Sequence, residues 1–222
     1  MPLSVTRPFL TPSNDSTTVT TPGALRAMSH ALEDVSLHGL PGAQLVVGIQ
    51  HLSVFHREEK RYRALAAACA HLWICAVYDD PPPAIDGITF VQICAEWPMA
   101  DERFVVMNAP GFASALLATE VIGRRSGQEG GFQTMFTSDA RLVNAICRSL
   151  AIELDLHMSL PAARDPEAQQ INLRRFNKLA LEYQERHAPR RTAPLVAHPR
   201  WTPPLVSPTC HFGERVVGGA EA

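Results

Sequence analysis

Hydrophobic and polar residues follow two alternating periods along the middle of the chain. Short runs rich in β-branched residues predict strands at residues 44–55, 72–78, 87–94, 103–108 and 132–136. Apolar residues at three- and four-residue spacing predict helices at residues 21–38, 57–71, 112–125, 139–155 and 165–187. This order predicts an α/β fold: a single compact domain whose central mixed sheet of about five strands is flanked by helices, with an extra amphipathic helix at the C-terminal side.

Several predicted helix borders carry their own chemical signals. Thr21 followed by Pro22 is typical of a helix start, because a threonine hydroxyl accepts from the first free amides and proline lacks one. Asp139 offers the same capping oxygens before the helix that follows it. The charged run at residues 57–61 is predicted to cover the solvent side of its helix.

The two ends of the chain differ in composition from the middle. Residues 1–20 are rich in Ser, Thr and Pro, so we expect a flexible arm there. Residues 21–155 are predicted to form the folded domain, and residues 166–187 a separate amphipathic helix. Prolines from Pro189 onward predict a weakly ordered tail at residues 188–222.

The C-terminal helix at residues 166–187 has an apolar face and a basic face. The apolar face predicts either packing on the core or a contact with a partner or a second copy in a homodimer, which we favour; its residues are Ile171, Leu173, Phe176, Leu179 and Tyr183. The basic face supports an alternative, a regulator that binds nucleic-acid phosphates through Arg174, Arg175 and Lys178.

Composition and charge argue against several functional classes. At 222 residues and 46% hydrophobic content the chain can bury one sizeable core. A formal net charge of −2 gives no overall attraction to nucleic acids. The sequence has no run of about 18 apolar residues and no signal-like N-terminus, so we expect a cytoplasmic protein without a membrane segment.

Motifs for catalysis or metal binding are absent from the sequence. The five cysteines include no Cys-x-x-Cys pair, and the nine histidines never stand at the close spacings of metal ligands. There is also no Gly-x-Ser-x-Gly elbow and no phosphate-binding glycine loop. We therefore expect no metal, no cofactor and no enzymatic activity. The weaker enzyme alternative would use Asp79, Asp80 and His56.

Several segments in a fixed order resemble a known family. They are the helix beginning Phe55-His-Arg-Glu-Glu-Lys-Arg-Tyr62, the strand ending at Asp79, the segment Asp101-Glu-Arg-Phe-Val-Val-Met-Asn108 with the alanine-rich stretch after it, and Phe132-Gln-Thr-Met-Phe-Thr-Ser-Asp139. Together they resemble the DICT sensory domain, a family associated with diguanylate cyclases and two-component systems. The resemblance implies a role in signal transduction through a small ligand, a signalling partner protein or both.

The resemblance also directs attention to possible ligand-binding residues. Arg103 and Phe136 stand where the family pattern leads us to expect tryptophan, which implies that this protein binds a different ligand or none. Asp79 ends a strand, where open α/β sheets commonly place ligand contacts. Tyr62 and Trp97 could add aromatic contacts, so the candidate ligand site comprises Tyr62, Asp79, Trp97, Arg103 and Phe136.

Overall fold

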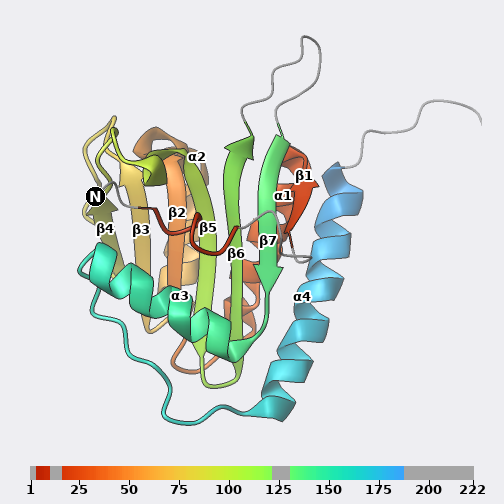
Figure 1. Cartoon of the computed structure of the whole chain (residues 1–222). Helices are drawn as coiled ribbons and strands as arrows, with labels where there is room; N and C mark the ends of the chain where they lie inside the picture. The colour runs from red at the N-terminus through yellow and green to blue at the C-terminus, as the bar shows by residue number, and fades with distance from the viewer. Residues whose placement is uncertain (1–3, 11–16, 122–130, 188–222) are drawn as a thin grey trace, which may run out of the picture. The chain divides into compact units, whose positions relative to one another are not determined.

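Seven strands form one mixed sheet in the computed structural model (Figure 1), which describes residues 4–10, 17–121 and 131–187. The strands are β1 (Thr17–Thr20), β2 (Gln44–His51), β3 (His71–Val77), β4 (Ile88–Gln92), β5 (Glu102–Ala109), β6 (Phe112–Val121) and β7 (Gly131–Thr137). The helices are α1 (Pro22–Asp34), α2 (Leu52–Ala68), α3 (Ala140–Glu153) and α4 (Pro166–His187), with short 3-10 turns η1 (Ser36–His38) and η2 (Pro98–Asp101). The predicted α/β domain is confirmed.

The sheet joins a parallel part to an antiparallel part. Its strand order is β1-β7-β6-β5-β2-β3-β4. Strands β2, β3 and β4 run parallel, with α2 as the crossover between β2 and β3. All pairs from β2 through β5, β6 and β7 to β1 are antiparallel. The change from parallel to antiparallel pairing therefore falls at β2, in the middle of the sheet.

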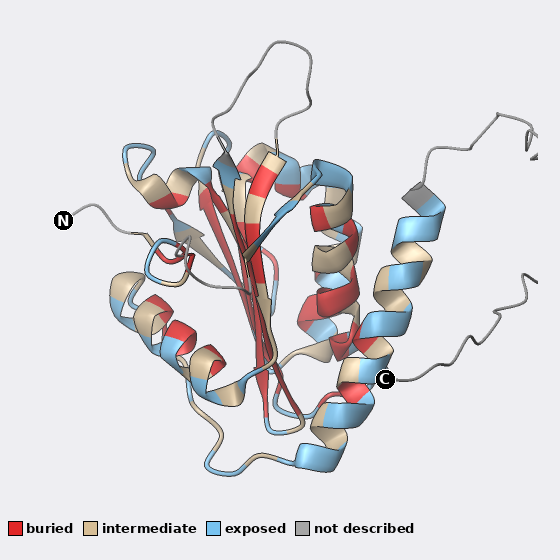
Figure 2. Cartoon of the chain, turned by 45° about the vertical axis from the view of Figure 1, so that its right-hand side comes forward, coloured by how far each residue is buried: buried red, intermediate tan, exposed pale blue. Residues whose placement is uncertain are grey.

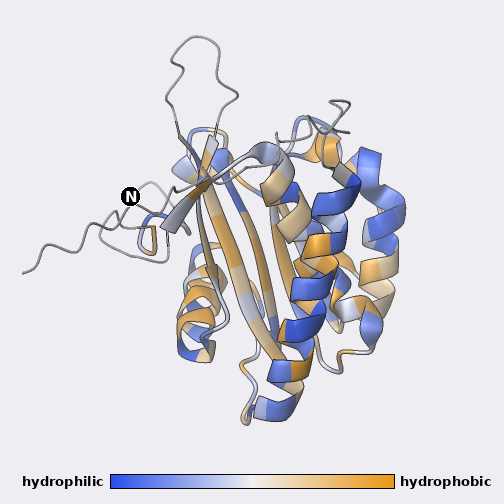
Figure 3. Cartoon of the chain, turned by 90° about the vertical axis from the view of Figure 1, so that its right-hand side faces the viewer, coloured by the Kyte–Doolittle hydropathy of each residue, from blue (hydrophilic) through white to orange (hydrophobic). Residues whose placement is uncertain are grey.

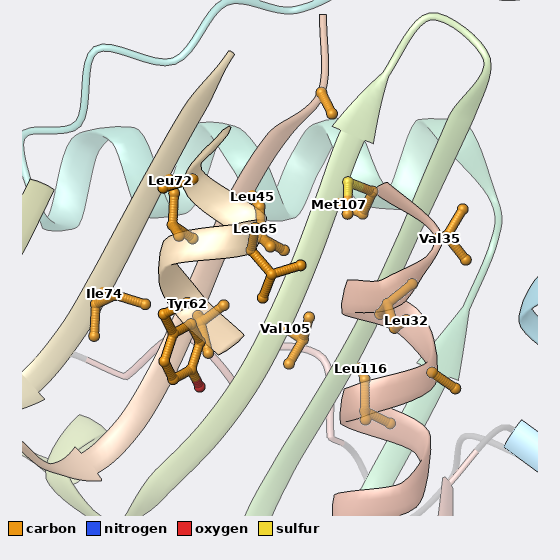
Figure 4. Packing of buried hydrophobic residues seen from close by; sticks show 14 of the residues in the cluster. Leu32, Val35, Leu45, Tyr62, Leu65, Leu72, Ile74, Val105, Met107 and Leu116 are labelled. Atoms are coloured by element: carbon orange, nitrogen blue, oxygen red, sulfur yellow. The ribbon is translucent and has the colours of Figure 1, made fainter. Parts of the chain in front are cut away.

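Helices cover both faces of this sheet and create two cores (Figure 2). On one face, α1 and α2 bury leucine, valine and aromatic side chains against β2, β5 and β6, as Figure 4 shows for Leu32, Leu65 and Val105. On the other face, α3 packs against the sheet together with Val5 and Leu10 from the N-terminal segment. Both faces are thus closed, which explains the hydrophobic character of the central strands.

The predicted number of about five strands is wrong, and β6 is the main reason. Residues 112–125 were expected to form an alanine-rich helix, but Phe112–Val121 is a strand. It lies between β5 and β7, and its alanines are completely buried. Small side chains suit a central strand with helices on both faces, so tertiary context overrides the helix propensity of alanine. Pro110 and Gly111 form the two-residue connection of a β5–β6 hairpin.

The second additional strand lies inside the segment predicted to be a flexible arm. Residues 17–20 form β1, which pairs with β7 at the edge of the sheet. Further toward the N-terminus, Val5 is fully buried, and the Glu102 carboxylate accepts from the Val5 and Thr6 amides at 3.0 and 3.1 Å. The arm prediction is therefore wrong for these residues, because a buried carboxylate and the edge of β7 supply backbone partners that composition alone does not reveal.

The predicted helix starts were partly right. The Thr21 side chain caps α1 by accepting from the Ala24 amide, and Asp139 caps α3 by accepting from the Arg141 and Leu142 amides. Helix α2 begins at Leu52 rather than near residue 57, because β2 ends at His51. The predicted tail at residues 188–222 lies outside the described residues.

Helix α4 packs on its own domain, and this overturns part of the predicted partner face. Phe176 is buried and stacks on Phe136, with ring centroids 4.7 Å apart. The side chains of Leu173, Leu179 and Tyr183 also pack against the core that contains α1. Among the five predicted contact residues only Ile171 is exposed, at 49%. Most of the outward surface of α4 is polar (Figure 3).

Side-chain amides fix the start of α4 to the β5–β6 hairpin. Gln169 accepts from the Ala113 amide at 2.7 Å and donates to the Ala113 carbonyl at 3.0 Å. Pairing between β6 and β7 begins only at Ala115, so Gln169 satisfies backbone groups that β7 does not reach. Asn172 donates to the Gly111 carbonyl at 3.1 Å. These contacts explain why α4 belongs to the folded domain.

Candidate functional site

A cavity of about 300 Å³ lies between α1 and α2, above β2 and β5. Its walls combine apolar side chains with several charged ones. The lining residues are Leu25, Arg26, Ser29, His30, Glu33, Val47, Gly48, Ile49, Val54, Arg57, Glu58, Tyr62, Arg103, Phe104 and Val105. Its size is at the lower end of the range for small-molecule sites.

The cavity lies where β2 and β5 stop pairing. Their ladder runs from Gln44 opposite Asn108 to Gly48 opposite Phe104, whereas β2 continues to His51. Beyond the ladder, Arg103 Nη2 donates to Gln50 Oε1 at 2.9 Å. This is the carboxyl end of the parallel strands, next to a change in strand direction, and open α/β sheets typically bind ligands at such a place.

Arg103 brings a half-buried positive charge to this cavity. Its guanidinium lies 5.3 Å from the centre of the Phe132 ring, and its Nε is buried without a hydrogen-bond partner among the described residues. Burial lowers its pKa, but arginine stays protonated at neutral pH. No described carboxylate lies within ion-pair distance of it. The Glu120 charge acts on it from farther away, and its direct contacts are the Gln50 amide oxygen and an aromatic face.

Tyr62 places a phenol on the same cavity. Its side chain is 4% exposed and its ring stacks on Phe55, with centroids 5.3 Å apart. Burial raises its pKa well above the ordinary value, so the hydroxyl stays protonated. Its side chain is one of those that line the cavity. Figure 4 shows Tyr62 on the side of the sheet that carries Val105. The structure thus brings together Tyr62 and Arg103, two of the five predicted ligand residues.

A charged clamp joins α1 to α2 beside the cavity. Glu58 Oε1 lies 2.6 Å from Arg26 Nη2, and Glu58 Oε2 lies 2.9 Å from His30 Nε2. The hydrogen bond from His30 is the main reason that the pKa of Glu58 falls to about 2. The Glu58 carboxylate is therefore ionised and fully engaged at neutral pH.

A second ion-pair network begins at the cavity and ends at α4. Glu33, whose side chain is 2% exposed, lines the cavity and lies 2.7 Å from Arg61 Nη2. Arg61 Nη1 also lies 2.8 Å from Asp34 and donates to the Tyr183 hydroxyl at 3.3 Å. Tyr183 in turn donates to Asp34 at 2.5 Å. This contradicts the prediction that residues 57–61 lie only on the solvent side of α2.

The pKa directions in this network reflect burial and pairing. Burial raises the pKa of Glu33, although the Arg61 charge opposes this effect. Burial alone would lower the pKa of Arg61, but the charges of Glu33 and Asp34 outweigh it and raise the value. Arg61 is therefore charged at any pH at which the protein folds, and it is the main group compensating the buried Glu33 carboxylate.

The other three predicted ligand residues lie elsewhere. Asp79 caps α2: its two carboxylate oxygens accept from the Ser53 amide and hydroxyl at 2.9 and 2.5 Å. Trp97 packs on the opposite face of the sheet, in the core that contains α3. Phe136 stacks on Phe176 beneath α4. Sequence position did not reveal these roles, because each depends on a contact between distant segments.

The residues of the enzyme alternative meet at the surface. His51 Nδ1 lies 4.0 Å from Asp79, and His56 Nε2 lies 3.9 Å from Asp80. The side chains of both pairs are at least 37% exposed, and none of these four residues lines the main cavity. Asp79 is already engaged as a helix cap, so the arrangement favours a structural role.

The residues proposed for nucleic-acid binding line a separate surface groove on α4. Arg174, Arg175 and Lys178 lie there with His38 and Glu182. Arg175 donates to the Asn172 side chain at 2.6 Å, and Lys178 lies 3.9 Å from Glu182. The groove shares no lining residue with the main cavity, and its charge is partly balanced by Glu182.

Sequence reasoning missed the polar residues of the clamp. Arg26 and His30 stand four residues apart on α1, and neither was among the predicted site residues. Glu58 lies in the charged run of α2. Complementary charges on two consecutive predicted helices were the available signal, but only the fold brings these helices together.

In residues 4–10, 17–121 and 131–187, no group of three or more His, Cys, Asp or Glu side chains is placed to hold a metal ion. None of the helices in these segments has the length and apolar content needed to cross a membrane.

Comparison with protein families gives one match. The model described as "Sensory domain in DIguanylate Cyclases and Two-component system" (DICT) matches residues 5–121. Every residue that lines the main cavity lies within this segment, whereas β7, α3 and α4 lie beyond it. No curated protein matches the chain.

Among solved structures, similarity is found to the polyphosphate kinase of Porphyromonas gingivalis. The two chains are 12% identical with a TM-score of 0.42, over 78% of this chain and 29% of the kinase chain. This chain therefore spans less than a third of the kinase, and a likeness of this strength bears on neither fold nor function.

Proposed function

The chain belongs to the DICT family of sensory domains, and from this premise we propose that it senses a small molecule bound in the cavity between α1 and α2. One observation carries the proposal: a half-buried arginine, whose buried Nε has no hydrogen-bond partner among the described residues, and a buried phenol line the same cavity. Protein donors left unused in a partly enclosed site are suited to bind ligand acceptors.

Helix α4 is the proposed output of the sensor. Glu33 lines the cavity, and its partner Arg61 contacts both Asp34 on α1 and Tyr183 on α4. A ligand that displaces α1 relative to α2 would have to rearrange these ion pairs, which would change how α4 is held. In this proposal, ligand binding changes the surface of α4, and a signalling partner protein recognises the changed surface.

Catalysis is not part of the proposal. The Ser, Cys and His side chains of the described residues form no nucleophile–base pair in the cavity: Ser29 donates to the Leu25 carbonyl, and His30 is bound to Glu58. Burial raises the pKa of Cys75, which disfavours a reactive thiolate. We accordingly propose a cytoplasmic, non-enzymatic regulatory protein.

Homodimer formation is the proposed state in solution, with a smaller contact than the sequence suggested. Ile171 and Leu181 are the exposed large apolar residues of α4, at 49% and 62%. Because α4 covers its own core, deleting it would expose Phe136, and point substitution is the cleaner test. A dimer through this face predicts that Ile171→Glu lowers the mass measured by sedimentation to that of a monomer. An unchanged dimer mass would remove this face from the interface.

Native mass spectrometry after incubation with a small-molecule cell extract tests the ligand proposal. The purified wild type should retain a small molecule, whereas Ser29→Phe, which places a ring in the cavity from α1, should retain none. Ala145→Phe, at an exposed position on α3, is the matched control and should behave as the wild type. Equal retention by Ser29→Phe and the wild type would contradict binding in this cavity.

A further inference from the structure

We infer that the cavity between α1 and α2 selects small organic anions, molecules with an apolar body and one acidic group, and that Arg103 receives the acidic group. The inference rests on the proposed ligand-sensing function and specifies the chemistry of its ligand. It is carried by the distribution of charge around the cavity and by the surroundings of Arg103.

Among the half-buried arginines around the cavity, Arg103 is the one that no described carboxylate approaches to ion-pair distance, although the Glu120 charge acts on it from farther away. Arg26 is paired with Glu58 and Arg61 with Glu33 and Asp34, at distances of 2.6 to 2.8 Å. Arg57 also lines the cavity but is exposed to solvent. A charge removed from water is costly unless it is paired, so Arg103 favours occupation by an anion.

The carboxylates at the cavity do not favour a cationic ligand. Both Glu58 oxygens are engaged, one by Arg26 and one by His30. Glu33 is bound to Arg61. A cation would have to displace one of these partners, whereas an anion at Arg103 displaces none.

The Arg103 guanidinium is held in a defined position. Gln50 accepts from Nη2 on one side, and the Phe132 ring lies 5.3 Å from the guanidinium carbon. A guanidinium carries five N–H donors, and the Gln50 oxygen is its sole hydrogen-bond acceptor among the described residues. The remaining donors match the two oxygens of a carboxylate, or those of a phosphate or sulfonate.

The rest of the wall defines the non-acidic part of the ligand. Leu25, Val47, Ile49 and Val105 supply apolar surface. The Tyr62 hydroxyl offers one further donor at this wall. An inorganic anion would leave the apolar walls without contacts, so an amphipathic organic acid fits better.

Two fluorescent probes with the same aromatic body test the inference. 8-Anilinonaphthalene-1-sulfonate carries an acidic group, and N-phenyl-1-naphthylamine lacks it. The wild type should bind the sulfonate at least about tenfold more tightly, since a hydrogen bond to a buried charge is worth roughly that factor or more. Arg103→Gln should lower the affinity for the sulfonate about tenfold to a hundredfold and leave the neutral probe within about twofold.

Arg63→Gln is the matched control. It removes the same charge from an exposed position on α2 outside the cavity, so neither affinity should change. Ser29→Phe should abolish binding of both probes, which locates them in the cavity. Arg103→Lys keeps the charge and should retain part of the preference for the sulfonate.

The possible failures are distinguishable. Equal affinities of the wild type for the two probes would overturn anion selectivity while leaving ligand sensing intact, and this comparison stands even if Arg103→Gln does not fold. A preference for the sulfonate that survives Arg103→Gln would likewise overturn the role of Arg103. Failure of both probes to bind would contradict the inference and the ligand-binding part of the proposed function together.

Discussion

Replacing Arg61 with methionine removes the cation that compensates a buried carboxylate. The Glu33 side chain is 2% exposed and the Arg61 side chain 19%, so the pair lies largely outside bulk water. Breaking a buried ion pair by removing one partner costs about 3–5 kcal/mol, because the remaining charge stays buried. Domains of this size have a free energy of unfolding of roughly 5–15 kcal/mol, so the loss is a large fraction of the total.

The comparison variant is Arg63→Met on the same helix. Arg63 pairs with Glu59 at 2.7 Å, but their side chains are 54% and 34% exposed. Such i,i+4 surface pairs contribute only about 0.3–0.5 kcal/mol. Urea unfolding followed by circular dichroism should therefore place the midpoint of Arg61→Met far below that of Arg63→Met. Equal losses of about 1 kcal/mol or less in both variants would refute the argument.

The Arg61→Met loss should also depend on pH with a definite sign. Burial raises the pKa of Glu33 above 4.5 in the folded state, and removing Arg61 takes away the charge that opposes this rise. When a carboxyl group has a higher pKa in the folded state than in the unfolded state, its contribution to the free energy of unfolding is largest below the unfolded-state pKa. That contribution is lost as the pH rises through the folded-state pKa. The deficit should therefore shrink when unfolding is measured at a pH near 4.5. A deficit that is constant from neutral to acid pH would contradict the role of Glu33.

Three further outcomes follow from individual contacts. Gly48→Ala should destabilise the fold by about 1–3 kcal/mol in urea unfolding, because its Cβ would lie 2.3–2.5 Å from ring atoms of buried Phe104; a change below about 0.5 kcal/mol would contradict this. The pKa of Glu58 is lowered to about 2, so the stability that its carboxylate contributes is present above pH 4.5 and lost as the pH falls toward 2. Glu58→Gln should therefore reduce the pH dependence of the unfolding free energy between pH 4.5 and 2, and an unchanged pH dependence would contradict the role of the clamp. Gln169→Ala should cost about 1–3 kcal/mol by leaving backbone groups of β6 unsatisfied, while exposed Gln170→Ala should cost less than about 0.5; equal effects would argue against the α4 attachment.

Elements with strong periodicity or clear caps could be predicted from the sequence. Helix α4 was expected at residues 165–187 and occupies Pro166–His187, and Thr21 and Asp139 cap α1 and α3 as predicted. Residues close in sequence determine where these helices begin. Strand β6 could not be predicted, because its alanines favour a helix until helices on both sides of a sheet require small residues there.

The candidate site was less predictable than the fold for a similar reason. Tyr62 and Arg103 were expected to contact a ligand and do share a cavity. Asp79 was expected there on general grounds, yet the cap of a helix starting at Leu52 uses its carboxylate. Contacts between segments that are distant in sequence decide which polar residue is already engaged and which is left for a ligand.

The apolar face of α4 illustrates the limit of amphipathicity as evidence. Its spacing is equally consistent with packing on the core and with a partner contact, and the structure uses most of it for packing. The consequence for function is that α4 is coupled to the sheet and to α1 rather than independent of them. A signal reaching α4 would therefore arrive through the domain core.

Hydrogen–deuterium exchange with and without a saturating anionic ligand tests the central claim most directly. The claim is that occupation of the cavity between α1 and α2 changes how α4 is held, although no α4 residue lines that cavity. The expected result is altered amide protection within Pro166–His187 in the wild type, and a smaller change in Tyr183→Phe, which loses the hydroxyl that meets Asp34. Changes confined to α1, α2, β2 and β5, with α4 exchange unaffected, would contradict the account.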